Sequence, residues 1–163
     1  MESAIKTPEQ LLRYRSLRQI LSDKPAGVHA VDAGSSVFSA IQLMASMNIG
    51  LVVVEEAGKP VGVVSERDYA RKVILEGRSS RDTIVREIMT TGVVTVGLDH
   101  TVPQCMAMMN AGGFRHLPVV ADGRMLGILS IRDLLKEMVA HHERLIRDME
   151  LAKLSMLSGG TSY

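Results

Sequence analysis

The pattern of apolar positions predicts the same series of elements twice along the chain. Apolar residues recur at helical spacing over 37–48 and again over 102–111, with Ser or Thr before each stretch as an N-cap. Two short runs rich in β-branched residues follow each helix, and glycine-containing turns separate the runs, which predicts adjacent strands. Earlier short runs at Val28–Val31 and Val93–Val96 predict one further strand ahead of each helix. The adjacent strands are predicted at 51–54 and 61–64, and at 117–120 and 126–129.

The two series are copies of one unit. The segment 61–69 matches 126–134, and the glycine, serine, arginine and aspartate of the two segments stand at corresponding places. We therefore predict a mixed α/β fold (α+β) of two strand–helix–strand–strand–helix repeats at 20–76 and 85–140, joined by a linker over 77–84. A unit of about 60 residues buries too little surface for comfortable stability alone, so the two copies are expected to pair.

Helical segments flank the repeats at both ends. Residues 1–19 contain a capping-box pattern that begins at Thr7, and this pattern predicts an N-terminal helix over about 8–21. At the other end, the pattern stays helical from Ile131 until Gly159-Gly160, within a C-terminal extension and tail at 141–163. This helix either packs on its own domain or meets a partner chain with its far end, because its apolar residues follow a heptad spacing. The predicted seam consists of Ile131, Leu135, Met138, His142, Leu145, Met149, Ala152 and Met156.

Composition and charge exclude several classes of function. Of the 163 residues, 46% are hydrophobic but only 3% are aromatic, so stacking platforms for nucleic-acid bases are nearly absent. The net charge of +1 provides no positive field for a phosphate backbone. No apolar run approaches the roughly 20 residues of a membrane-spanning helix, and the single cysteine, Cys105, permits no internal disulfide. We expect a cytoplasmic protein that binds neither nucleic acid nor membrane, with Cys105 and most methionines in its core.

The recurring Ser-x-Arg-Asp motif stands where a strand is predicted to run into a helix. Ser65-Glu66-Arg67-Asp68 and Ser130-Ile131-Arg132-Asp133 have the spacing of a capping box, so a purely structural role is one open interpretation. The other is ligand binding. A serine hydroxyl, an arginine guanidinium and the N–H groups of a helix N-terminus all suit a phosphate group. An aspartate carboxylate accepts hydrogen bonds from both hydroxyls of a ribose, and repetition of the whole set favours this interpretation.

These features together resemble a pair of CBS domains, also called a Bateman module. The resemblance rests on the duplicated unit, on the Gly-h-h-Ser-x-x-Asp motif, and on 115–120 and 126–133 in the second copy. The stretch 65–73, followed by Gly77-Arg78-Ser79-Ser80, is similar to small stand-alone CBS-pair proteins of bacteria and plant organelles. The resemblance implies pseudo-twofold pairing of the copies and a homodimer. It also implies two clefts for an adenosyl ligand such as AMP, ADP, ATP, NAD or S-adenosylmethionine.

The resemblance assigns site residues by their position in the motif. A ribose contact falls to Asp68 and Asp133, and Arg115 and His116 match a strand start that lines the ligand cleft. Because the first-copy counterpart of Arg115 is the uncharged Gly50, the two sites are expected to be unequal. The remaining assignments are phosphate binding by Ser65, Arg67, Ser130 and Arg132, and packing of the base by Val28 and Val93.

No arrangement typical of an enzyme emerges from the sequence, so neither catalytic residues nor a catalytic cofactor are expected. We expect a nucleotide sensor that regulates an unknown partner protein on a separate polypeptide. Two alternatives stay open: a dimeric scaffold that works without nucleotide, and a metal-binding protein that uses its histidines. The adjacent His141 and His142 make a poor chelating pair because their side chains diverge by about 100° on a helix. A solvated face is expected for Arg13, Arg15 and Arg18. The resemblance lets Arg71 and Lys72 reach additional phosphates, but a solvated helix face is the favoured expectation for them too.

Overall fold

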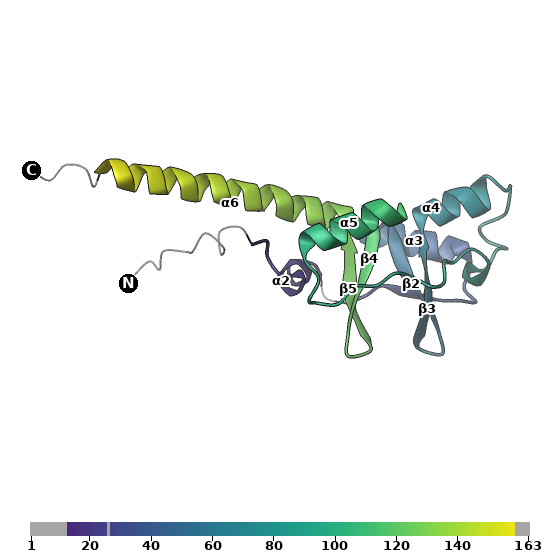
Figure 1. Ribbon diagram of the computed structural model, residues 1–163. Helices are drawn as coiled ribbons and strands as arrows, with labels where there is room; N and C mark the ends of the chain where they lie inside the picture. Colours follow the sequence, from purple (N-terminus) through teal and green to yellow (C-terminus); the bar gives the residue numbers. More distant parts are fainter. Residues whose placement is uncertain (1–12, 26, 159–163) are drawn as a thin grey trace, which may run out of the picture. The chain divides into compact units, whose positions relative to one another are not determined.

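The computed structural model describes residues 13–25 and 27–158, which cluster into two compact units (Figure 1). The first unit combines the described residues up to Lys24 with Gly97–Leu117 and with the chain from Leu129 onward. The second unit contains Pro25–Val96 and Pro118–Ile128. The strand hairpin of the second repeat thus contributes to both units.

A three-stranded sheet organises the second unit. Its order is β1–β2–β3, with β1 (Ala30–Asp32) parallel to β2 (Leu51–Glu56) and β2 antiparallel to β3 (Lys59–Ser65). The helix α3 (Val37–Met47) connects β1 to β2, because parallel neighbours require a crossover. After β3 come α4 (Glu66–Tyr69), a π-helical turn η1 (Ala70–Ile74) and a 3₁₀ turn η2 (Val85–Glu87).

Aliphatic side chains from α3 and the sheet form the core of the second unit. The helix α3 is well defined at both ends, since Ser36 accepts the N–H of Ser39 and Asn48 ends the helix in a left-handed conformation. Full burial of one such side chain contributes about 1.5–3 kcal/mol. The buried cluster consists of Ala33, Val37, Ala40, Met44, Val52, Val54, Val64, Val73, Val85 and Ile88.

Three helices and part of the second hairpin make up the first unit. The helices are α2 (Leu17–Ser22), α5 (Val102–Gly112) and α6 (Ile131–Ser158), and the hairpin pairs β4 (His116–Ala121) with β5 (Arg124–Ser130). Cys105 is buried, which confirms its predicted place in the core. The other buried hydrophobic residues of this unit are Leu17, Ile20, Val102, Met109, Leu117, Leu129 and Leu134.

The predicted duplication is confirmed element by element. The pairs α3 and α5, β2 and β4, and β3 and β5 have equal lengths and a constant separation along the chain. Both helices end on a left-handed residue, Asn48 or Gly113. Both hairpins turn through two residues of positive φ, Ala57–Gly58 and Asp122–Gly123, which is the geometry of a tight type I′ turn. The mixed α/β class with two repeats and a long C-terminal helix is therefore confirmed, whereas pseudo-twofold pairing stays a prediction.

The predicted first strand of each repeat forms fully in one copy only. In the first copy β1 begins two residues later and ends one residue later than expected, and Val53 donates its N–H to the carbonyl oxygen of His29 at 3.0 Å. At the place of Val53 the second copy has Pro118, which has no N–H to donate. Only an isolated bridge from Val96 to β4 remains, so the strand predicted at Val93–Val96 is wrong.

The N-terminal helix is shorter than predicted. Residues 13–16 are not helical, and α2 begins at Leu17 because Ser16 caps it. The Ser16 hydroxyl accepts the N–H of Gln19, while the Gln19 side chain accepts the N–H of Ser16. The predicted helix over 8–21 is therefore wrong at 13–16, and its earlier part, with Thr7, lies outside the described residues.

The helix α6 buries a different stripe from the predicted heptad seam. Leu134, Glu137 and His141 are buried, at spacings of three and four residues that place them on one side of the helix. Leu135 and Met149 of the predicted seam are exposed. The predicted seam is therefore not the stripe that packs on the chain's own domain.

Candidate ligand-binding sites

Both Ser-x-Arg-Asp motifs lie at a junction where a strand runs directly into a helix, β3 into α4 and β5 into α6. In each repeat, the first N–H of the helix donates to the residue that precedes the neighbouring strand. Glu66 donates to the carbonyl oxygen of Gly50 at 3.1 Å, and Ile131 donates to that of Arg115 at 2.9 Å. The predicted strand-start residues therefore lie beside the helix N-terminus in both repeats.

Each junction contains a complete capping box. Asp68 Oδ2 accepts the Ser65 backbone N–H at 3.0 Å and the Ser65 hydroxyl at 2.7 Å, while the Asp68 N–H donates to Ser65 Oγ at 3.2 Å. The same three distances between Ser130 and Asp133 are 2.8, 2.9 and 3.3 Å. The capping interpretation of the motif is thus confirmed. Since these bonds already use N–H groups of the first turn, the helix ends offer fewer free donors to an anion than the sequence predicts.

Asp68 has further partners in the second unit. Its Oδ1 lies 2.8 Å from Lys72 Nζ and accepts the Thr90 hydroxyl at 3.3 Å. Lys72 also donates to the carbonyl oxygen of Ile88 at 2.7 Å, so it is not the solvated side chain that the sequence predicts. Both oxygens of Asp68 are therefore occupied within the chain.

Asp133 is held by a lysine from outside its own helix. Lys24, which follows α2, places its Nζ 2.7 Å from Asp133 Oδ2, the oxygen that Ser130 also uses. Within residues 13–25 and 27–158, no hydrogen bond or ion pair reaches Asp133 Oδ1. The two aspartates therefore share a capping role and differ in how many of their oxygens are occupied.

Both aspartates are largely buried, with 14% of the Asp68 side chain and 18% of the Asp133 side chain exposed. Burial opposes ionisation, but the bonds from Lys72 and Ser65 outweigh it and hold the pKa of Asp68 below its usual range. Burial likewise opposes ionisation of Asp133, and Lys24 and Ser130 lower its pKa. Both carboxyls are therefore negatively charged at neutral pH, and in that state they can accept hydroxyl groups.

The structure brings together the serine and the aspartate of each motif, and the roles of the other predicted site residues stay predictions. Three arginines are exposed, where a guanidinium can reach a phosphate group from solvent. The two valines predicted to contact a base are half-buried. The residues concerned are the exposed Arg67, Arg115 and Arg132 and the half-buried Val28, Gly50, Val93 and His116.

Comparison with known proteins shows which family has this repeated unit. The family model of the CBS domain matches residues 17–74 and 85–140, which together make up more than half of the chain. The chain belongs to the CBS-domain family. CBS pairs are generally regulatory, non-catalytic modules that typically bind adenosyl ligands and commonly form oligomers.

The relatives of this CBS pair include curated proteins from a plant and an archaeon. The mitochondrial CBS domain-containing protein CBSX3 of Arabidopsis thaliana is 38% identical over 112 residues, covering 66% of this chain and 54% of the relative. An uncharacterized protein of Methanopyrus kandleri is 35% identical over 111 residues, covering 65% of this chain and 57% of the relative. The chain thus spans little more than half the length of these relatives.

Solved structures of CBS proteins have the same fold. A protein with CBS domains from Burkholderia ambifaria superposes with a TM-score of 0.75 at 42% identity, covering 77% of this chain and 95% of that one. A hexameric CBS-CP12 protein from bloom-forming cyanobacteria superposes with a TM-score of 0.67 at 26% identity, covering 75% and 67%. In the part of the chain that the structure describes, no helix combines the length and apolar character needed to cross a membrane.

Two polar residues at the CBS junctions were not found by sequence reasoning. Lys24 is separated from Asp133 by 109 residues, and Thr90 is separated from Asp68 by 22, so neither contact leaves a local pattern. The ion pair between Lys72 and Asp68 could have been found, because four residues is the spacing of neighbours on a helix.

A buried glutamate on α6 also went unnoticed in the sequence. The side chain of Glu137 is 0% exposed, and its Oε2 lies 2.7 Å from Arg15 Nε. Its Oε1 accepts the Arg15 backbone N–H at 3.0 Å and lies 2.6 Å from Arg144 Nη2. Burial raises the pKa of Glu137, but the bonds to the two arginines lower it below its usual range. The solvated face predicted for Arg15 is therefore wrong.

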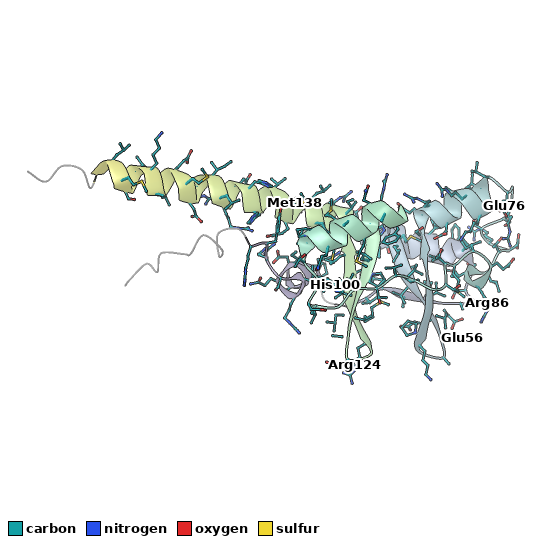
Figure 2. The ribbon with its side chains drawn as sticks, in the orientation of Figure 1. Glu56, Glu76, Arg86, His100, Arg124 and Met138 are labelled. Atoms are coloured by element: carbon teal, nitrogen blue, oxygen red, sulfur yellow. The ribbon has the colours of Figure 1, made fainter. Side chains whose placement is uncertain are left out.

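The histidines are dispersed over several local environments. His141 is buried with its ring centroid 4.3 Å from that of Tyr14, and His142 Nδ1 lies 2.7 Å from the carbonyl oxygen of Met138. His100 lies on the loop before α5 (Figure 2) and accepts the N–H of Gly97 at 3.2 Å. Among the described residues, no group of three or more His, Cys, Asp or Glu side chains could hold a metal ion.

Proposed function

We propose that this CBS pair is a regulatory module that binds an adenine nucleotide or related adenosyl ligand at its two strand-to-helix junctions. The proposal rests on one observation: the same set of side chains stands at the strand-to-helix junction of both repeats. In both repeats an ionised, largely buried aspartate and a serine stand at the start of a helix, with an arginine between them. A cap alone does not require this set, because glutamate is the better partner in a capping box and the arginine takes no part in it. The proposed CBS domains extend over 20–76 and 85–140, with the linker at 77–84.

In this proposal each side chain has a distinct role. Asp68 and Asp133 accept the ribose hydroxyls, which suits a carboxylate that keeps its charge at neutral pH. The base packs on half-buried valines. Arg115 gives the second repeat a charge that Gly50 does not provide in the first, and His116 lines the same cleft. The phosphate-binding residues are Ser65, Arg67, Ser130 and Arg132.

The two sites should differ in affinity. A ribose at Asp68 must displace Lys72 or Thr90 from Oδ1, and this displacement costs the bonds that those groups make. A ribose at Asp133 meets an oxygen without a partner among the described residues. We therefore propose that the Asp133 site fills first.

Thermal unfolding with single ligands tests the proposal directly. AMP, ATP, NAD and S-adenosylmethionine are added one at a time to protein that has been freed of carried-over nucleotide. A ligand at about 100 times its dissociation constant adds about 2.7 kcal/mol, which at this chain length raises Tm by about 5–10 °C. The absence of a shift with all four ligands would overturn the proposal.

Substitution of the aspartates tests the site itself. D133A should weaken the binding of the stabilising ligand more than D68A does, as measured by isothermal titration at a temperature where both variants are folded. Each variant also loses a cap, which costs about 1 kcal/mol of stability. The variants T101A and S36A lose the N-cap of α5 or α3 and keep every proposed ligand-binding residue, so they serve as matched controls for the loss of a cap. Full affinity in both aspartate variants would show that ribose binds elsewhere.

The complete capping boxes favour a second candidate, a dimeric scaffold whose partner binds regardless of nucleotide. Binding of a captured partner protein with and without the stabilising nucleotide separates the two: a sensor changes partner affinity on ligand binding, and a scaffold does not. Metal analysis of the purified protein tests the remaining histidine-based alternative.

The proposal also includes the setting in which the module acts. We propose a homodimer without catalytic activity, located in the cytoplasm, that transmits the nucleotide state to a separate protein. The hexameric cyanobacterial CBS-CP12 protein supports self-association in general terms. Since CBSX3 of Arabidopsis is named as mitochondrial, localisation of a tagged full chain is the measurement that checks the cytoplasmic assignment.

A further inference from the structure

An exposed apolar stripe runs along α6, separate from the side of this helix that is buried within the first unit. Leu135, Val139, Ile146 and Met149 are all exposed. With 3.6 residues per turn, these four residues lie on one side of the helix, well away from the side that carries the buried Leu134. Single exposed apolar residues are ordinary, but a continuous stripe indicates an interaction surface.

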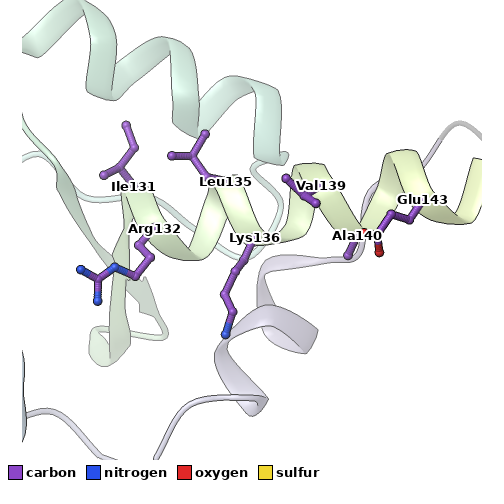
Figure 3. Close-up of a pocket in the computed structure, with 7 residues that line it drawn as sticks. All are labelled: Ile131, Arg132, Leu135, Lys136, Val139, Ala140 and Glu143. Atoms are coloured by element: carbon purple, nitrogen blue, oxygen red, sulfur yellow. The ribbon is translucent and has the colours of Figure 1, made fainter.

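The stripe lies beside a charged edge. Leu135 and Val139 line an open groove on α6 together with Lys136 and Glu143 (Figure 3). Figure 3 shows Leu135 and Val139 on one side of the helix axis and Lys136 extending away from them. The groove is therefore apolar along its middle and charged along its edge.

The charge of this edge reverses along the helix. Lys136 comes before the middle of the stripe and Glu143 comes after it, one heptad later. Arg147, one turn beyond Glu143, is basic again, so the reversal belongs to the heptad 136–143. Neither Lys136 nor Glu143 forms an ion pair within the part of the chain that the structure describes. Both charges are thus available to a partner.

We propose that the stripe binds α6 of a second copy of the chain, with the two helices antiparallel. This inference rests on the proposed homodimer and adds its contact surface and orientation. A two-fold axis near Ala140 places Lys136 of each copy beside Glu143 of the partner subunit. It also places Leu135 opposite Ile146 of the partner subunit and Val139 opposite His142 of the partner subunit.

The reversal of charge favours a second copy of the chain as the partner, and it favours the antiparallel orientation of the two helices. A two-fold contact requires a surface that is complementary to itself, and an edge that runs from basic to acidic meets this requirement only when its partner runs the other way. In a parallel pair in register, Lys136 and Glu143 stand about 10 Å apart along the axis, so they cannot form the ion pair. The heptad spacing of the apolar stripe suits helix–helix pairing in either direction, so the charges decide.

A charge swap tests the proposed pairing. Dimer dissociation is measured by analytical ultracentrifugation of the full chain at low salt. K136E and E143K should each weaken the dimer about tenfold, because two exposed ion pairs are lost and like charges replace them. The double variant K136E/E143K should restore affinity to near the wild-type value, because each new charge again meets its opposite. R124E, the same change of charge on the β4–β5 hairpin, is the control and should leave the dimer unchanged.

Two apolar positions of equal exposure provide a second comparison. Val139 and Leu151 are both 59% exposed on α6, so neither V139E nor L151E should impair folding. V139E should dissociate the dimer because it buries a charge next to the proposed axis, whereas L151E lies off the stripe and should not. Circular dichroism confirms that both variants are folded.

Disulfide trapping determines the orientation. Cys105 is buried, so an engineered thiol on α6 is the reactive one. Under a mild oxidant H142C should form an intermolecular disulfide because it lies near the proposed axis. M149C should not, since its two copies are about 25 Å apart in the antiparallel pair. Trapping by M149C and not by H142C would overturn the antiparallel pairing.

The oligomeric state of the wild type and that of the variants test the homodimer and the α6 contact separately. A wild-type chain that is monomeric at every concentration overturns both the homodimer and the pairing. A dimer that is insensitive to K136E, E143K and V139E overturns the α6 surface and leaves the homodimer standing. A dimer that is weakened by both single charge variants and restored by the double variant supports the pairing.

Discussion

At the scale of single residues, the packing around Gly62 explains why the motif Gly-h-h-Ser-x-x-Asp begins with glycine in the first repeat. The adjacent Val63 exchanges two backbone hydrogen bonds with Thr90, at 3.0 and 2.8 Å. A Cβ on Gly62 would lie 2.6 Å from the Thr90 carbonyl oxygen, and this obstacle is backbone that cannot rotate away. The same approach brings the Thr90 hydroxyl to Asp68, so the glycine positions a residue of the candidate site.

We expect G62A to lower the free energy of unfolding by about 2 kcal/mol, because the added methyl group must push back a bonded strand. Urea denaturation measures the change. G34A is the control, since a Cβ there meets only the movable Asp32 side chain, at 3.1 Å. Equal stability of G62A and the wild type would mean that the Thr90 segment is not held as described.

At the scale of elements, Glu137 joins α2 to α6. Its carboxylate receives Arg15 from the residue before the N-cap of α2 and Arg144 from two turns further along α6. Lys24 makes a second link, from the end of α2 to Asp133, four residues before Glu137 on α6. The short α2 is therefore held at both ends by carboxylates on one helix, and one of these carboxylates belongs to the candidate ligand site.

Removal of the Glu137 carboxylate should loosen α2. We expect E137A to lower the free energy of unfolding by about 2 kcal/mol. This is less than the roughly 3–5 kcal/mol for a fully buried pair, because both arginines can still reach water. E137Q should cost less, since an amide still accepts one of the bonds. E150A, an exposed position on the same helix, should change stability by less than about 0.5 kcal/mol. Hydrogen exchange over Leu17–Ser22 should rise in E137A, and unchanged protection there would contradict this account.

At the scale of the whole molecule, buried titratable groups make stability depend on pH. The pKa values of Asp68, Asp133 and Glu137 lie below their ordinary values of 3.8 and 4.5, so these groups stabilise the fold above those values and lose their contribution as the pH falls. Burial, with Arg144 and His142 nearby, lowers the pKa of His141 below 6.5. Its neutral form is therefore favoured in the folded state, and its contribution is also lost on acidification.

The free energy of unfolding should accordingly fall in two stages as the pH decreases. The first stage begins below pH 6.5 as His141 becomes protonated in the unfolded chain, and the second begins below about pH 4.5 with the carboxylates. H141F keeps a ring beside Tyr14 and should remove the first stage only. Urea denaturation between pH 8 and pH 4 measures both. A first stage of the same size in H141F would assign it to another group.

Much of the fold could be predicted from the sequence because its signals are local. Caps, tight turns and strand–helix alternation depend on residues a few positions apart, and Ser65 with Asp68 or Ala57 with Gly58 carry such signals. The duplication strengthened these local signals, because the same pattern occurs in both repeats. The serine and aspartate of each candidate site were predictable for the same reason.

The contacts that distinguish the two copies depend on distance in space and leave no pattern along the chain. Lys24 reaches Asp133 across 109 residues, and Arg15 reaches Glu137 across 122. Pro118 prevents a strand only because its missing N–H falls on a ladder that Val53 completes in the first copy. The buried side of α6 likewise follows from what packs against it, because a helix with apolar residues on several sides is compatible with more than one packing stripe. Local chemistry thus specifies the elements and the motif, while the partners of Asp133, Glu137 and α6 are set by the folding of distant segments into contact.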